Sequence, residues 1–184
     1  MLDLCTGSGA LAIAAARAGA KSVTAVDVSR RAVATARVNA ALNGVRVEAL
    51  RGDLLRPVSG RRFDVIVSNP PYVPSEEDAV PRRGRRRAWD AGSDGRTLLD
   101  RITREARAHL SPGGTLWLVH SSVCDTGRTL ESLASAGLEP TVAKSERGPL
   151  GPLLAARAPM LAQRGLIDAD TGEEELVVIR AMAA

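Results

Sequence analysis

The N-terminal stretch Leu2-Asp3-Leu4-Cys5-Thr6-Gly7-Ser8-Gly9 joins a short apolar strand to a glycine-rich turn. The residues that follow it, 10–18, are rich in alanine and predict a helix. Glycines in a strand-to-helix turn let the backbone approach a ligand closely, and the helix points its positive end at the same place. The stretch therefore predicts the first unit of an α/β fold, with a nucleotide site at its turn.

Strand and helix patterns alternate along the rest of the chain, which predicts a parallel sheet with helices on both faces. We expect strands at 1–4, 22–26, 45–50, 63–67, 115–120, 138–144 and 176–181, and helices at 10–18, 30–42, 97–110, 127–136 and 150–163. Ser29 is placed to cap the second helix. Its expected packing face consists of Val33, Ala34, Ala36, Val38, Ala41 and Leu42. Pro159 should kink or end the last helix.

The composition is that of one globular domain, 1–184. Of its residues 45% are hydrophobic, and a chain of this length buries roughly 70% of the surface that its unfolded form exposes. No run approaches the roughly 20 apolar residues of a membrane span, so we expect no membrane association. Cys5 and Cys124 lack metal-ligand spacing and make no disulfide framework, which predicts no metal site and a reducing, cytoplasmic environment.

The positive charge of the chain is concentrated in one segment. Arg82, Arg83, Arg85, Arg86 and Arg87 lie within six positions, and subtracting their five charges from the net +4 leaves −1 for all other residues. Such a patch favours docking of a polyanion, such as a nucleic acid, or of an acidic protein face. A solvated loop is the competing interpretation.

Two acidic residues follow successive strands of the predicted sheet. Asp27 ends the second strand, where a carboxylate can accept hydrogen bonds from both ribose hydroxyls, and Asp53 follows the third. Each is also an ordinary turn or capping residue. Gly7-x-Gly9-x-x-Ala12 fits a dinucleotide fingerprint, so a nicotinamide-dependent oxidoreductase stays open at this point.

The fourth strand runs into Asn69-Pro70-Pro71-Tyr72, which contains the only tyrosine of the chain. The prolines stiffen this loop and remove backbone donors. The Asn69 side-chain oxygen and the Pro70 carbonyl can then accept hydrogen bonds from a planar NH2 group, while Tyr72 offers a flat face. A simple turn is the alternative. In a parallel sheet this loop, the glycine turn and both acids lie at the same edge.

These motifs together resemble the class I S-adenosylmethionine-dependent methyltransferases of the Asn-Pro-Pro-Tyr branch. Residues 2–13, 69–74 and 89–95 are most similar to the HemK-like release-factor glutamine methyltransferases, in their stand-alone, single-domain form. The resemblance implies a Rossmann-like, mostly parallel seven-stranded sheet with an antiparallel strand near the C-terminus. It also implies S-adenosylmethionine as cofactor and a planar nitrogen as methyl acceptor.

The same resemblance assigns roles to individual residues. The cofactor-binding residues would be Asp3, Thr6, Gly7, Gly9, Asp27, Asp53 and Asn69, with Asp27 on the ribose and Asp53 at the adenine end. Substrate binding would involve Asn69, Pro70, Pro71 and Tyr72, of which Asn69, Pro70 and Tyr72 would be catalytic. Holding both reactants in place can contribute roughly 7 to 11 kcal/mol, so positioning should outweigh acid–base catalysis. His120 is accordingly expected to be structural.

The chain departs from the family in three places. Cys5 occupies the position of the first glycine of the turn, which is tolerable if φ there is negative. Met1 falls inside the first strand, so we expect a domain that is N-terminally truncated relative to the family. Residues 147–163 form an insertion before the last strand.

The methyl acceptor is the least determined feature. The HemK-like pattern favours a glutamine of a release factor as substrate and the release factor as partner. The arginine segment keeps an RNA or DNA base-amine methyltransferase open, acting on adenine N6 or guanine N2. A non-catalytic cofactor-binding domain is the remaining alternative.

Overall fold

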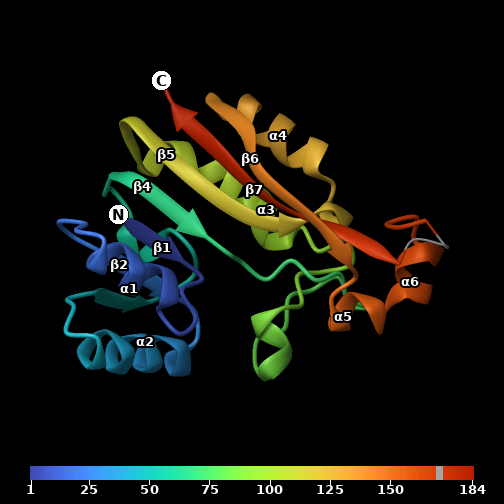
Figure 1. Ribbon diagram of the computed structural model, residues 1–184, viewed down its shortest axis with the longest axis horizontal. Helices are drawn as coiled ribbons and strands as arrows, with labels where there is room; N and C mark the ends of the chain where they lie inside the picture. The colour runs from blue at the N-terminus through green and yellow to red at the C-terminus, as the bar shows by residue number, and fades with distance from the viewer. Residues whose placement is uncertain (169–171) are drawn as a thin grey trace.

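Strands and helices alternate along the chain in the computed structural model, which describes residues 1–168 and 172–184 (Figure 1). The elements up to the Asn-Pro-Pro-Tyr loop are β1 (Leu2–Leu4), α1 (Ala10–Arg17), β2 (Thr24–Asp27), α2 (Arg30–Leu42), β3 (Glu48–Arg51), the 3-10 turn η1 (Arg56–Val58) and β4 (Phe63–Ser68). After the loop come η2 (Arg85–Ala88), α3 (Thr97–Glu105), η3 (Ala106–His109), β5 (Leu110–Ser121), η4 (Ser122–Cys124), α4 (Thr126–Ser135), β6 (Leu138–Pro149), α5 (Pro152–Ala155), α6 (Ala158–Gln163) and β7 (Glu173–Ala183).

The seven strands form one sheet in the order β3-β2-β1-β4-β5-β7-β6 (Figure 1). Neighbouring strands from β3 to β5 are parallel, whereas β7 enters between β5 and β6 antiparallel to both. The structure thus confirms the predicted Rossmann-like, mostly parallel sheet with an antiparallel strand near the C-terminus. The carboxyl ends of β1 to β5 meet at one edge, and β7 starts at that edge.

Strand β1 lies inside the sheet, between β2 and β4. All three of its residues are buried, because a central parallel strand is covered on both faces. Helix α3 packs Leu99 and Ile102 into the same core, together with Ala106 just beyond its end. The helices α1 and α2 contact each other near β1 to β3, and α3 contacts α4.

The packing face of α2 was only partly predicted. Ser29 caps this helix as expected, because its Oγ accepts a hydrogen bond from the Ala32 N–H. Val33, Ala36 and Ala40 are buried. The expectation that Val38 and Leu42 pack inward is wrong, since they are 58% and 80% exposed. The alanine-rich sequence placed apolar residues on several sides of the helix, so spacing alone did not select one.

Element boundaries differ where proline and glycine intervene. The helix predicted at 97–110 is shorter in the structure, where α3 ends at Glu105. The 3-10 turn η3 follows it, and β5 begins at Leu110. The predicted stretch 150–163 forms two short helices with a break between them. Pro159 lies in the first turn of α6, where its missing N–H costs nothing. Within the described residues, no helix is long and apolar enough to cross a membrane.

Candidate functional site

A cavity of about 920 Å³ lies at the carboxyl edge of the sheet. It is lined by residues from four successive strand ends, namely Gly7, Asp27, Gly52, Asp53, Asn69 and Pro71. Open parallel sheets bind ligands at this edge. The structure therefore brings together the glycine turn, both acids and the Asn-Pro-Pro-Tyr loop, as expected. Among the predicted site residues, Asp3, Thr6, Gly9, Pro70 and Tyr72 do not line the cavity.

The glycine turn after β1 has an unusual backbone. Cys5, Gly7 and Gly9 have φ angles of +57°, +56° and +85°. The expectation of a negative φ at Cys5 is therefore wrong, and a side chain stands here in the left-handed region that favours glycine. At Gly9 a Cβ would lie 3.0 Å from that of Ala36, so the missing side chain lets the turn approach α2.

Asp3 shapes this turn from inside the protein. Its carboxylate is buried, and Oδ2 accepts hydrogen bonds from the Thr6 hydroxyl at 2.5 Å and from the Ala12 N–H at 3.1 Å. These contacts join the strand, the turn and helix α1. Burial raises the pKa of Asp3 to about 6, although both hydrogen bonds oppose the shift. Thr6 is buried as well, so both residues act on the cavity through the turn.

Asp27 faces the cavity in an orientation fixed by backbone donors. Its Oδ2 accepts the Gly7 N–H at 3.0 Å, and its Oδ1 accepts the Ser29 N–H at 2.8 Å. Each carboxylate oxygen retains a lone pair for a further donor. This single side chain links the glycine turn to the start of α2 and presents acceptors to a ligand.

Asp53 is paired with Arg101, a residue that sequence reasoning did not identify. Arg101 donates from Nη1 to Oδ1 at 2.9 Å and from Nη2 to Oδ2 at 2.8 Å, and both residues line the cavity. The Arg101 guanidinium holds the pKa of Asp53 below its usual value. Because both oxygens already accept a strong bond, the assignment of Asp53 to the adenine end stays a prediction. The residues are 48 positions apart, so no local pattern could reveal the pair.

The Asn-Pro-Pro-Tyr loop splits its side chains between cavity and core. Asn69 is exposed on the cavity wall, and no hydrogen bond of its side chain occurs within the described part of the chain. Pro70 is buried and Pro71 lines the cavity. Tyr72 is half-buried against the main core, and burial raises the pKa of its hydroxyl. The amide of Asn69 is thus a polar group of the loop that is open to a ligand in the cavity.

The back of this loop rests on residues from far along the chain. Cys124 Sγ donates to the Tyr72 carbonyl at 2.9 Å. Gly95 lies against the same carbonyl with φ +73°, and a Cβ there would overlap the carbonyl oxygen and lie 2.8 Å from Cys124 Sγ. Burial raises the pKa of the Cys124 thiol to about 12. The sequence offers no signal for this role of Cys124, because Tyr72 and Cys124 are 52 positions apart.

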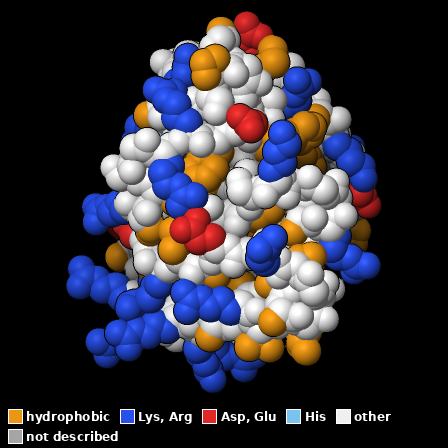
Figure 2. Space-filling model, turned by 90° about the vertical axis from the view of Figure 1, so that its left-hand side faces the viewer, with side chains coloured by type: hydrophobic (Ala, Val, Ile, Leu, Met, Phe, Trp, Pro, Cys, Tyr) orange, Lys and Arg blue, Asp and Glu red, His pale blue; other side chains and the backbone are white. Residues whose placement is uncertain are grey.

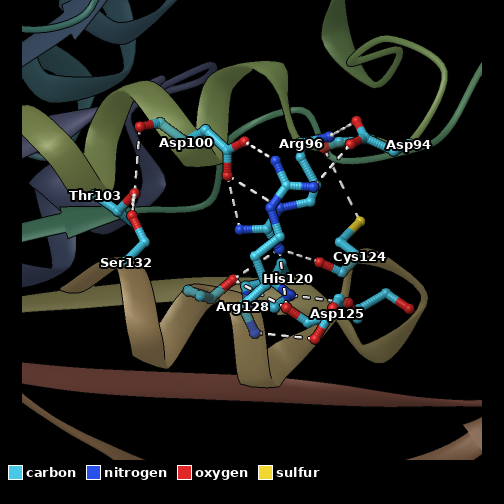
Figure 3. A network of polar contacts seen from close by, with 12 residues as sticks. Asp94, Arg96, Asp100, Thr103, His120, Cys124, Asp125, Arg128 and Ser132 are labelled. Atoms are coloured by element: carbon cyan, nitrogen blue, oxygen red, sulfur yellow. Dashed lines mark hydrogen bonds and ion pairs between the residues drawn. The ribbon is translucent and has the colours of Figure 1, made fainter. Parts of the chain in front are cut away.

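A buried arginine holds Cys124 in place (Figure 3). Arg96 is 2% exposed and donates to the carbonyls of Cys124 and Asp125, to the Thr129 hydroxyl and to the Asp100 carboxylate. Figure 3 shows Asp100 of α3 on one side of Arg96, and Cys124 and Asp125, just before α4, on the other. A buried charge is retained where such partners satisfy it. The network therefore fixes the segment that supports Tyr72.

Residues 152–164, most of which belong to the predicted insertion, contact the residues that follow the loop. Arg157 donates to the Pro74 carbonyl at 2.7 Å and pairs with the buried Asp90 at 2.7 Å. Arg164 donates to the Ser75 carbonyl at 2.6 Å. Val73 packs in a small cluster with Leu154 and Leu161 of the two inserted helices. The insertion is thus part of the support of the loop.

The arginine segment forms one wall of the cavity. Arg82, Arg85 and Arg87 line it, together with Val80, Pro81, Gly84 and Ala88 of the same segment. Figure 1 shows this segment as a green lobe between α2 and α5, away from the sheet. Figure 2 shows basic side chains along the lower edge of the face on the side of α1 and α2. Because Arg82, Arg85 and Arg87 line the cavity, they belong to the same site as Asp27 and Asn69.

The histidines lie outside the cavity. His120 is fully buried, its Nδ1 is 2.8 Å from the Ser121 carbonyl, and burial lowers its pKa. His109 contacts the Arg61 carbonyl. Both positions fit structural histidines. In the part of the chain that the structure describes, no group of three or more acidic, histidine or cysteine residues could hold a metal ion.

Comparison with known proteins identifies relatives of this site. Residues 1–82 match the family model described as the methyltransferase small domain. A candidate protein N5-glutamine methyltransferase of Methanocaldococcus jannaschii is 35% identical over 158 residues, 86% of this chain and 80% of that protein. A release factor glutamine methyltransferase of Bordetella pertussis is 40% identical over 146 residues, 75% of this chain and 53% of that protein.

A ribosomal protein uL3 glutamine methyltransferase of Bradyrhizobium diazoefficiens is 42% identical over 143 residues, and the chain spans 43% of its length. Among solved structures, the Mtq2-Trm112 complex of E. cuniculi aligns with a TM-score of 0.64 at 20% identity, over 100% of this chain and 84% of that one. The ribosomal protein L11 methylase of Lactobacillus delbrueckii subsp. bulgaricus aligns at 0.61 with 24% identity, over 97% and 67%. These structural likenesses show the fold.

The raised pKa of Asp3 predicts a pH-dependent stability. The folded protein holds this proton up to about pH 6, while the unfolded chain releases it near 3.8. The proton therefore stabilises the fold fully below pH 3.8, and that stabilisation is lost as pH rises through 6. At about 1.4 kcal/mol per pH unit, the free energy of unfolding should fall by about 2 kcal/mol between pH 4 and 7, relative to Asp3→Asn.

Urea unfolding of both proteins across this pH range measures the difference, and the variant cancels the contributions of other groups. The Asn side chain keeps one acceptor oxygen for Thr6 and Ala12. A difference that stays constant from pH 4 to 7 would show that Asp3 titrates normally.

The close packing behind Tyr72 predicts that Gly95→Ala is more disruptive than Gly113→Ala. Both glycines have a similar positive φ, +73° and +71°, but at Gly113 an added Cβ would meet nothing within 4 Å. Gly113→Ala should cost only the backbone strain, about 1 kcal/mol. Gly95→Ala should cost about 1 to 3 kcal/mol more through overpacking.

Urea unfolding gives the two costs. Alkylation with peptide mapping should also show a faster reaction of Cys124 in Gly95→Ala alone, because the thiol leaves its buried contact with Tyr72. Equal losses of stability in the two variants would contradict the proposed close packing.

Proposed function

Because the chain belongs to the family of HemK-like, S-adenosylmethionine-dependent protein glutamine methyltransferases, we propose that it methylates the side-chain amide of a glutamine in a peptide-chain release factor. The observation that carries the proposal is the free Asn69 amide, which opens the Asn-Pro-Pro-Tyr loop and lines one cavity with Gly7, Asp27 and Asp53. The proposal takes residues 1–184 as a single methyltransferase domain acting in the cytoplasm.

The residues present fit the cofactor. A volume of about 920 Å³ is within the range of small-molecule and cofactor sites. Gly7 adds no side chain to the wall, and Asp27 offers the acceptors that ribose hydroxyls need. When bound, S-adenosylmethionine supplies a methyl group activated by its sulfonium. Asp27, Gly7 and the residues of the turn that Asp3 supports would hold it.

The Asn-Pro-Pro-Tyr loop would bind and orient the amide group that accepts the methyl. An amide nitrogen is a poor nucleophile because its lone pair is delocalised, so its NH2 group must be oriented. The Asn69 side-chain oxygen and the Pro70 carbonyl would accept hydrogen bonds from that group, with Tyr72 beside it. Positioning can contribute roughly 7 to 11 kcal/mol, against about 1 kcal/mol net for one neutral hydrogen bond. A rigidly supported loop is therefore the main requirement.

Two kinds of glutamine substrate appear among the relatives. One group is named for release factors and another for the ribosomal protein uL3. The structural neighbour Mtq2-Trm112 is described as methylating the termination factor eRF1. We place the release factor first, and uL3 is the second protein substrate to test.

A base-amine methyltransferase is the second candidate function. The observation that favours it is the arginine segment on the cavity wall, since arginines bind phosphates. The named relatives weigh against it, because they are glutamine methyltransferases. An oxidoreductase would have no use for the Asn-Pro-Pro-Tyr loop, and a non-catalytic domain would need no free amide there.

The role of Asn69 predicts a selective loss of activity. Asn69→Ala should lower the methyl-transfer rate by about 100-fold or more, because an oriented polar group at the reacting atom is removed. Cofactor affinity should change by less than about threefold. Its side chain has no partner among the described residues, so stability should be unchanged. Asn43→Ala removes the same type of side chain away from the cavity, just beyond α2, and is the control for the transfer rate; it should lower stability slightly, because the Asn43 amide donates to the Asn39 carbonyl.

Incubation with methyl-labelled S-adenosylmethionine and release factor, uL3 or ribosomal RNA identifies the acceptor. Peptide mapping should place the label on a glutamine of the release factor. Label on RNA alone would contradict the proposed function and support the base-amine reading. Unchanged turnover of Asn69→Ala would refute the assigned role of this residue.

A further inference from the structure

The charged residues of the cavity do not balance. Asp53 is neutralised by its two bonds to Arg101. The remaining acid is Asp27, and it shares the cavity wall with Arg31, Arg82, Arg85 and Arg87. The site therefore carries excess positive charge at its rim, where Arg82 and Arg85 are exposed.

This excess does not serve the cofactor. S-adenosylmethionine carries a sulfonium, an ammonium and a carboxylate, so its own net charge is positive. Arginines on the wall repel such a molecule. The imbalance indicates that a second, anionic group enters the cavity rim.

Of the five arginines of the segment, Arg86 and Arg87 make structural contacts, and Arg83 does not line the cavity. Arg86 pairs with Asp90 at 2.6 Å and with Glu77 at 3.3 Å, and Arg87 donates to the Arg82 carbonyl at 3.1 Å. Arg82 and Arg85 form no ion pair within the ranges 1–168 and 172–184. Arg86 and Arg87 thus hold the segment in shape, and Arg82 and Arg85 are left to bind a ligand.

A nucleic acid fits these observations poorly. Phosphate binding uses many basic contacts along a surface, and the chain outside this segment has a net charge of −1. Recognition of unpaired bases uses exposed aromatic rings. Phe63 is buried, and Tyr72, Trp89 and Trp117 are at most half-exposed.

We propose that Arg82 and Arg85 form a docking site for an acidic segment of the protein substrate, at the rim of the cavity that receives its glutamine. The proposal rests on the proposed function for the identity of the substrate. Arginine guanidinium groups bind carboxylates through paired hydrogen bonds, which gives direction as well as affinity. Docking beside the loop would bring the glutamine toward Asn69 and raise its local concentration.

Direct binding of a fluorescent oligoglutamate peptide tests the site without any methyl transfer. The double variant Arg82→Glu with Arg85→Glu should weaken this binding about tenfold or more. Arg46→Glu with Arg104→Glu makes the same charge change on exposed residues away from the cavity, and should weaken it less than about twofold. Arg82→Gln with Arg85→Gln should give an intermediate loss, which guards against misfolding of the charge reversal.

Three further measurements distinguish an acidic protein segment from a nucleic acid or the cofactor as the ligand of these arginines. With release factor as substrate, KM should rise for the Arg82 and Arg85 variants and become less sensitive to salt. Cofactor affinity should stay equal or become tighter, because the repelling charges are gone. A single-stranded RNA of similar charge should bind more weakly than the peptide.

Equal losses in both charge-reversed proteins would overturn the proposal, because only overall charge would then matter. Tighter binding of the RNA than of the peptide would overturn it in favour of a nucleic acid. If no protein substrate accepts methyl groups, the proposed function fails, and peptide binding still decides the docking site. Transfer with an unchanged KM in the variants refutes the docking site alone.

Discussion

One buried carboxylate oxygen supports the site. Asp3 Oδ2 accepts the Thr6 hydroxyl and the Ala12 N–H, and so ties the central strand to the glycine turn and to helix α1. Asp27, at the end of the neighbouring strand β2, holds the same turn by accepting a hydrogen bond from the Gly7 N–H. With these acceptors in place, the turn can hold Cys5 in a left-handed conformation that costs free energy. Asp3 was expected in the cofactor site, and its position explains how it acts there without lining the cavity.

The second constraint concerns the Asn-Pro-Pro-Tyr loop, which is stiff by sequence and is also held from behind. The Tyr72 carbonyl is held by Cys124 and lies against Gly95, and the buried Arg96 fixes the segment that contains Cys124. Farther along the loop, the Pro74 carbonyl accepts a hydrogen bond from Arg157. Such support suits a reaction whose rate depends on placing a poor nucleophile. Among the described residues the Asn69 side chain forms no hydrogen bond, so its amide is available at the cavity.

The sequence alone was sufficient to predict which motifs meet at the site. Gly7, Asp27, Asp53 and Asn69 follow successive strands, and parallel strands bring such residues to one edge. Contacts between distant residues were not predictable, because neither the Arg101 pair of Asp53 nor the Cys124 contact of Tyr72 leaves a local pattern. The predicted packing face of α2 was partly wrong for another reason, since alanine and valine occur on several sides of this helix. The charge of the arginine segment is evident from the sequence, whereas its position on the cavity wall is evident only from the structure.

Titration calorimetry with S-adenosylmethionine tests the central claim, that the edge held by Asp3 and Asp27 is the cofactor site. Asp27→Ala removes the acceptors for the ribose and for the Gly7 N–H, whereas Asp64→Ala removes an exposed carboxylate on β4 as a control. A hydrogen bond to a charged group is worth about 1.5 to 3 kcal/mol, so Asp27→Ala should weaken binding about 10-fold or more. The Asp64→Ala protein should bind like the unaltered chain. An Asp27→Ala affinity within about twofold of the unaltered protein would contradict the account.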